Sequence, residues 1–178
     1  HDALPIWHVN AGLMTLSKHT PTAVVRHAFP GNYGFPMNLV MLDRCFLVNR
    51  YPLNGGKELL IINTHNSAYD DGGLRSQQMA FLKEFLLREY KNGNYIVVGG
   101  DWNQSPAGFE AHFTNNAMDN QNRTDIPAAY LPEWTWAYDN TVPTNRRVAT
   151  PYQMGSSPTT VIDFFLLSPN IKALHVET

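Results

Sequence analysis

The sequence predicts a single α/β domain, on the basis of three buried-strand patterns and one amphipathic helix. Segments 58–65, 94–101 and 160–168 have near-continuous β-branched and aromatic content, as a strand covered on both faces requires. Segment 74–90, between the first two, repeats apolar residues at helical spacing. With 178 residues and 43% apolar content, the chain can bury one sizeable core. We therefore expect residues 1–178 to form one globular domain.

The remaining elements follow from local composition. Two further strands are expected at 12–17 and 39–51, and the turn residues of 52–56 predict a hairpin into the next strand. The helix should end at the Lys-Asn-Gly run of 91–93, because glycine suits the C-cap. Residues 106–158 are rich in Asn, Thr, Pro and aromatics with weak periodicity. They predict long loops with short helical pieces, and long loops in compact domains are usually functional.

The charge balance bears on the class of partner. The chain has 13 basic and 15 acidic residues, a formal net charge of -2, and no cluster of Lys and Arg stands out. A protein that holds duplex DNA through phosphate neutralisation usually presents a basic face. Bulk binding of nucleic acid is therefore disfavoured, whereas a small local phosphate site remains compatible with the sequence.

Membrane segments, cysteine content and the first residue exclude several structures but do not identify a function. No apolar run approaches the roughly 20 residues that cross a bilayer, so no transmembrane segment is expected. Cys45 is the only cysteine, which excludes an internal disulfide and a thiolate metal cluster. The chain starts at His1 rather than Met. This favours an extracytoplasmic protein that has lost a leader, or a piece of a longer chain.

Polar residues suited to chemistry lie in the predicted central strands or directly after them. His65 ends the first strand, Asp101 and Asn103 follow the second, and Asp163 lies in the third. If these strands are neighbours, an imidazole, two carboxylates and a carboxamide converge near one edge of the sheet. Ligands of α/β proteins bind at such edges, so the sequence predicts a site there.

Four motifs follow one another along the chain: Asn63-Thr64-His65, Leu74-Arg75-Ser76-Gln77-Gln78, Gly100-Asp101-Trp102-Asn103 and Val161-Ile162-Asp163-Phe164-Phe165. Together they resemble the endonuclease/exonuclease/phosphatase superfamily, which includes pancreatic deoxyribonuclease, abasic-site endonucleases, sphingomyelinases and inositol-polyphosphate phosphatases. A lone Gly-Asp-x-Asn is weak, but four ordered motifs are specific. The match spans about residues 11 to 170. It implies a four-layer α/β/β/α sandwich, with this chain as chiefly the second half of a bacterial-type member.

The resemblance also implies a metal-dependent phosphoesterase with a role for each matched residue. Asp101 would orient or deprotonate the attacking water, and Asn103 would help to hold that water and the phosphate. His65 would donate to a phosphate oxygen as charge grows there, and Arg44 would offer a forked donor to the same phosphate. Asp163 would hold a second, catalytic histidine in its working tautomer.

The expected cofactor is one or two Mg²⁺ or Mn²⁺ ions, which would polarise the phosphate. Asp101 and Asn103 are candidate ligands, but the main metal-binding glutamate of the family is expected outside this chain. The family's Ser-Asp-His histidine also matches no residue here. We therefore expect an internal piece of a longer member, truncated at both ends, which lacks hydrolytic competence unless another chain supplies the rest.

Several residues keep two interpretations. Arg44 could equally be a strand-end charge that lies over the sheet edge. Asn66, which directly follows the first motif, is a further candidate substrate ligand. Trp136 and Arg146 could line a recognition wall in the long loop, or belong to a minor core, which is the commoner fate of such aromatics. Three residues in the motifs are expected to be structural. Arg75 and Gln78 should anchor the helix to neighbouring loops, and Trp102 should pack beneath the site.

The substrate could be a phosphodiester or a phosphomonoester. The weak net charge favours a small molecule or lipid head group over duplex DNA, although nucleases belong to the superfamily. The alternative is a binding module that has lost the chemistry and keeps the pocket. No protein partner is predicted.

Overall fold

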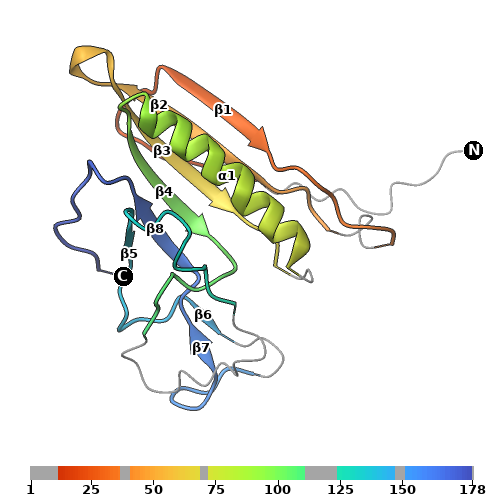
Figure 1. The fold of residues 1–178 in the computed structure, drawn as a ribbon. Helices are drawn as coiled ribbons and strands as arrows, with labels where there is room; N and C mark the ends of the chain where they lie inside the picture. Colours follow the sequence, from red (N-terminus) through yellow and green to blue (C-terminus); the bar gives the residue numbers. More distant parts are fainter. Residues whose placement is uncertain (1–11, 37–40, 69–71, 111–123, 147–150, 178) are drawn as a thin grey trace, which may run out of the picture.

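The computed structural model describes residues 12–36, 41–68, 72–110, 124–146 and 151–177. Within these ranges lie one α-helix, one 3-10 turn and eight strands (Figure 1): β1 (Ala23–Ala28), β2 (Cys45–Pro52), the 3-10 turn Asn54–Gly56, β3 (Glu58–His65), α1 (Gly73–Lys91), β4 (Tyr95–Asp101), β5 (Thr135–Ala137), β6 (Asn145–Arg146), β7 (Thr159–Thr160) and β8 (Asp163–Leu167). The mixed α/β class predicted from the sequence is confirmed.

Six strands form one sheet in the order β1-β2-β3-β4-β8-β5, and β6 pairs with β7 in a separate two-stranded sheet. β3 and β4 are parallel, and every other neighbouring pair is antiparallel. The 3-10 turn between β2 and β3 confirms the predicted hairpin. Because parallel strands need a crossover, the chain passes from β3 to β4 through α1.

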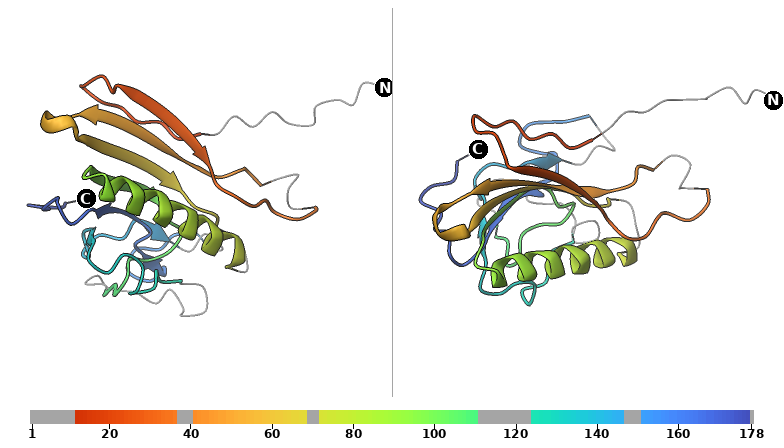
Figure 2. Two further views of the ribbon diagram at one scale, coloured as in Figure 1. Left: turned by 45° about the horizontal axis from the view of Figure 1, so that its top comes forward. Right: turned by 90° about the horizontal axis from the view of Figure 1, so that it is seen from above.

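The helix α1 lies along one face of the large sheet, as both views in Figure 2 show. Its position confirms the helix predicted for segment 74–90. The Phe85 ring of α1 lies 5.2 Å from the Phe46 ring of β2. Gly93, at φ +81°, follows the helix in the left-handed conformation that glycine adopts easily. The apolar face of α1 is buried against the sheet with Met79, Leu82, Phe85 and Leu86.

Gly100 allows β3 and β4 to approach closely. Its φ is +145°, and a Cβ at this position would overlap the carbonyl oxygen of Thr64 and lie 2.9 Å from the Thr64 nitrogen. Only glycine fits such a site without strain. This approach sets His65 opposite Asp101 in the β3–β4 register.

Two predicted strands differ from the structure. Residues 12–17 form no strand. They lie against the sheet through side-chain hydrogen bonds, in which Asn49 Nδ2 donates to Thr15 Oγ1 and Asn63 Nδ2 donates to the Met14 carbonyl, both at 3.1 Å. The strand predicted at 39–51 begins only at Cys45, the start of β2, and its first two residues lie outside the described ranges.

The third predicted strand is divided into β7 and β8. Thr144 Oγ1 accepts the backbone N–H groups of Ile162 and Asp163 at 3.0 and 3.1 Å, in place of a strand partner. The described residues between 106 and 158 form β5, β6 and turns instead of the short helical pieces predicted. Residues 111–123 and 147–150 of that segment lie outside the description.

The four-layer arrangement and the single-domain extent stay predictions. The described strands give one large sheet with α1 on one face and one small sheet apart from it. Within the described ranges, no helix combines the length and the apolar character needed to cross a membrane.

Candidate active site

The ends of β3 and β4 and the start of β8 place three side chains in one row. His65 lies opposite Asp101 in the parallel register, and Asp101 lies opposite Asp163 in the antiparallel register. Side chains paired across neighbouring strands point to the same face of the sheet. The predicted adjacency of the three strands is confirmed, and the imidazole and the two carboxylates meet at one end of the sheet.

His65 lies between a cation and a carboxylate. Arg44 Nη1 is 3.1 Å from His65 Nδ1, and His65 Nε2 is 3.5 Å from Asp101 Oδ2. Because a guanidinium can only donate, Nδ1 accepts and the ring proton is assigned to Nε2, which faces Asp101. Burial, followed by the Arg44 charge, lowers the pKa of His65, and Asp163 opposes this effect. The ring is therefore neutral at neutral pH and presents an N–H donor.

Asp101 is a partly buried carboxylate with one oxygen held by the backbone. Its Oδ1 accepts the N–H of Asn103 at 2.9 Å. Desolvation raises the pKa of Asp101, while this hydrogen bond and the Arg44 charge act in the opposite direction. A raised pKa makes the ionised carboxylate a stronger proton acceptor at neutral pH.

Asp163 is the most exposed member of the row. Desolvation is the largest effect and raises the pKa of Asp163. A hydrogen bond with Thr144 lowers this pKa, the charge of Asp101 raises it, and His65 lowers it. Neighbouring carboxylates disfavour each other's ionisation. The pKa of Asp163 therefore depends on the charge of Asp101.

Asn103 reaches the row from the turn after β4, at φ +50°, a conformation that Asn tolerates. Its Nδ2 donates to the carbonyl oxygen of Asn66 at 2.9 Å. The Asn66 side chain is fully buried, where the Thr64 hydroxyl donates to Oδ1 at 2.8 Å and Nδ2 lies 3.1 Å from the sulfur of Met79. The structure thus brings Asn103 to the site and places the Asn66 side chain beneath it.

The segment after β3 is anchored by α1. Arg75 Nη1 donates to the carbonyl oxygens of Ser67 and Ala68, each at 3.1 Å. Gln78 accepts the Ser67 N–H at 2.9 Å and donates to the Ser67 hydroxyl at 2.8 Å. These contacts confirm the anchoring role predicted for Arg75 and Gln78.

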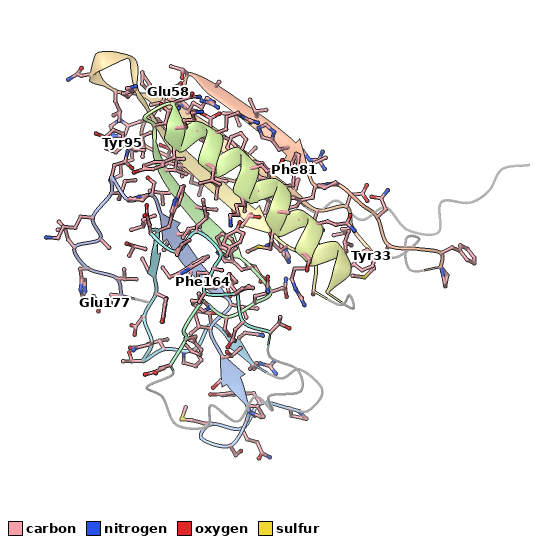
Figure 3. The ribbon with its side chains drawn as sticks, in the orientation of Figure 1. Tyr33, Glu58, Phe81, Tyr95, Phe164 and Glu177 are labelled. Atoms are coloured by element: carbon pink, nitrogen blue, oxygen red, sulfur yellow. The ribbon has the colours of Figure 1, made fainter. Side chains whose placement is uncertain are left out.

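Aromatic rings fill the other side of the sheet below the row. Trp102 is fully buried, donates from Nε1 to the Phe164 carbonyl at 3.1 Å and stacks on the Phe164 ring at 5.4 Å; Figure 3 labels Phe164 on β8. The packing role predicted for Trp102 is confirmed. Trp136 contacts both rings edge-on, at 5.6 and 5.5 Å. Since Phe164 and Asp163 are consecutive strand residues, they face opposite sides, so Trp136 lies across the sheet from the row.

Arg146 lies on β6, in the small sheet, and is exposed. Its guanidinium lies 5.8 Å from the centre of the Tyr152 ring. This cation–π contact places Arg146 among the loop aromatics.

A cavity of about 370 Å³ opens beside His65 and Arg44. This volume lies within the range of small-molecule sites. Arg26 of β1 also lines this cavity. The next residue, His27, packs against Phe46 and Phe85 on the α1 side, so Arg26 lies on the sheet face that α1 does not cover.

The side chains of the row do not by themselves make a complete metal site. In the part of the chain that the structure describes, no group of three or more His, Cys, Asp or Glu side chains is arranged to hold an ion. Asp101 offers a carboxylate, and Asn103 offers its amide oxygen, since its amide nitrogen donates to Asn66. A bound ion would need other ligands as well.

Sequence reasoning missed two residues of this region. Thr144 holds the start of β8 from a loop 19 residues earlier, and no local pattern reveals such a contact. Arg26 lines the cavity from β1. Recognition of β1 as a strand would have placed Arg26 on the same face as Leu47, its register partner.

Comparisons with known proteins agree on one fold. A family model described as "Endonuclease/Exonuclease/phosphatase family" matches residues 7–178, and no curated protein matches the chain. Truncated TDP2 from Caenorhabditis elegans is 16% identical with a TM-score of 0.51, over 84% of this chain and 52% of that one. ANGEL2, described as a 2′,3′-cyclic phosphatase, is 13% identical with a TM-score of 0.50, over 85% and 55%. The chain spans about half the length of these structures.

Proposed function

Because the chain belongs to the endonuclease/exonuclease/phosphatase family, we propose that its row of polar residues hydrolyses a phosphodiester or a phosphomonoester with an activated water. The supporting observation is that His65, Asp101 and Asp163 share one row beside a cavity. Titratable groups with perturbed pKa values in one cleft are the usual sign of acid–base chemistry. Enzymes of this family act on phosphate esters.

Asp101 is the proposed acceptor of the proton of the attacking water. Its Oδ1 is held by the N–H of Asn103, so the other oxygen is directed toward the row, where it faces His65. Asn103 would hold the water and a phosphate oxygen through its amide. Asp163 would orient a histidine, and among the described residues the histidine to which it is electrostatically coupled is His65.

Arg44 and His65 are the proposed donors to the phosphate oxygens. The Arg44 Nε is buried and has no hydrogen-bond partner among the described residues, a state that costs about 1–3 kcal/mol for a buried donor. Because this nitrogen is buried, a phosphate oxygen would bind the terminal guanidinium nitrogens of Arg44 and form a charge-assisted bond there. The Nε2–H of His65 lies 3.5 Å from Asp101, a long contact that leaves this donor available to a substrate.

Enzymes of this family generally use divalent metals, and we extend this requirement to Mg²⁺ or Mn²⁺ here. Such an ion supplies Lewis-acid polarisation of the phosphate when bound. Among the described residues Asp101 and Asn103 are the candidate ligands, and the other ligands are unassigned.

The proposed substrate is a small molecule or a lipid head group rather than duplex DNA. The net charge of -2 gives no basic face for a phosphate backbone. A cavity of about 370 Å³ holds one small ligand.

Release of nitrophenol from bis(p-nitrophenyl) phosphate and p-nitrophenyl phosphate by the full-length protein, with Mg²⁺, tests the proposal. We expect Asp101→Ala to lower the rate by about 10²-fold or more. Glu84→Ala, which removes an exposed carboxylate on α1, should leave the rate unchanged. Equal rates for wild type and Asp101→Ala would refute the assigned role.

The second candidate is a module that binds a phosphate ester without hydrolysis. The lack of a three-ligand metal group in the described ranges favours this alternative. Binding of the diester without product release, in the presence of Mg²⁺, would establish it.

A further inference from the structure

The cavity beside the row has a cation at each end. Arg44 and His65 form the end next to Asp101, and Arg26 of β1 lines the other end. The lining also includes the apolar side chains of Leu13, Leu42 and Leu47. Leu47 lies between the two ends, because it pairs with Arg26 on one side and with Asn63 on the other. This arrangement is asymmetric, because only one end adjoins the proposed water acceptor.

The strand register gives the separation of the two ends. Leu47 lies opposite Asn63 on β3 and opposite Arg26 on β1. His65 lies two residues beyond Asn63 on the same face, so Arg26 is two strands and two residues away from it. Strand spacings of about 4.8 Å and rises of about 3.3 Å per residue place the two Cα atoms roughly 12 Å apart.

The balance of charge in the cavity favours an anion. Arg26 and Arg44 are cations, and Asp43 is the one carboxylate among the described residues of the lining. Arg26 is exposed on the edge strand and forms no ion pair with the described residues. A guanidinium with no ion-pair partner in the described part of the chain is suited to a carboxylate or phosphate oxygen.

We propose that Arg26 binds a second anionic group of the substrate. The substrate class is then a compact phosphate ester with an anion at each end and an apolar or weakly polar spacer along Leu47. The ester at Arg44 and His65 is the one attacked, and the group at Arg26 sets specificity. This inference rests on the proposed function for the identity of the reacting end. Binding of the second anion by Arg26 does not require hydrolysis at that end.

Binding of two non-hydrolysable probes, measured by isothermal titration calorimetry, tests the proposal without relying on turnover. Pentane-1,5-diyl bisphosphonate carries an anion at each end, whereas pentylphosphonate carries one. We expect the wild type to bind the bisphosphonate about tenfold more tightly, the equivalent of one added charged contact of about 1.4 kcal/mol. Arg26→Gln should abolish this preference and leave the affinity for pentylphosphonate unchanged.

Arg88→Gln is the matched control. Arg88 is exposed on α1, against the opposite face of the sheet, so its loss changes the net charge equally without touching the cavity. This variant should keep the tenfold preference, and Arg26→Lys should keep part of it. Thermal unfolding checks that all three variants fold.

Equal binding of both probes by the wild type would overturn the proposal. So would an unchanged preference in Arg26→Gln, or no binding of either probe. Failure of the proposed function would give a different result. The wild type would then keep its preference for the bisphosphonate but release no nitrophenol from either nitrophenyl ester.

Discussion

Gly100→Ala should be among the most damaging single changes in the sheet. The added Cβ would overlap the Thr64 carbonyl oxygen and lie 2.9 Å from both the nitrogen and the carbonyl carbon of Thr64. These are backbone atoms of β3, so relief requires the parallel strands to separate. The φ of +145° adds strain of about 1–3 kcal/mol for any residue with a Cβ. Overlap and strain together give an expected loss of about 4 kcal/mol or more.

Gly55→Ala separates the two contributions. Gly55 also has a positive φ, +75°, but nothing lies within 4 Å of a Cβ built there. The left-handed conformation alone should cost about 1–2 kcal/mol.

Thermal unfolding followed by circular dichroism measures both variants. For a chain of this size each kcal/mol lowers Tm by about 2–4 °C. We expect a fall of roughly 8–16 °C for Gly100→Ala and roughly 2–8 °C for Gly55→Ala. Equal falls would refute the reasoning that the close approach of β3 and β4 requires glycine.

Three further predictions concern the row. Asp101→Asn should lower the hydrolysis rate by about 10²–10⁴-fold without lowering Tm at pH 7. Because the pKa of Asp101 is raised above 3.8, the folded chain holds this proton more tightly than the unfolded chain. The wild type therefore loses stability as pH rises from 3.8 through the folded pKa, and Tm measured against pH should show that the variant escapes part of this loss. Arg44→Met should raise the pKa of His65, since the Arg44 charge lowers it; an NMR titration of the ring that shows no rise contradicts this. EDTA should stop hydrolysis and Mg²⁺ or Mn²⁺ should restore it, whereas full activity in EDTA would exclude the metal requirement.

Elements with strong local patterns could be predicted from the sequence. The helix has apolar residues at i, i+3 and i+4 and a Lys-Asn-Gly end, and α1 follows this pattern closely. The strands ending at His65 and Asp101 have continuous apolar runs, so β3 and β4 lie where they were expected. Their adjacency followed from chain order, since a strand–helix–strand unit brings parallel neighbours together.

Elements that depend on distant contacts could not be predicted. β1 is a partly exposed edge strand, and its Ala-Val-Val-Arg-His-Ala sequence has no strong apolar period. The break between β7 and β8 depends on the Thr144 hydroxyl, which takes two backbone N–H groups from another part of the chain. The burial of the Asn66 side chain depends in the same way on the sulfur of Met79 in α1. Each of these is a tertiary contact that leaves no signal in the local sequence.

A double-mutant cycle on kcat/KM for the nitrophenyl diester, with His65→Gln and Asp101→Asn, tests most directly whether the row acts as one site. If both residues serve the same transition state, the double variant should be little slower than the slower single variant, because groups that act as a unit are not additive. Losses that multiply would show that the two side chains act independently, and would contradict a shared site.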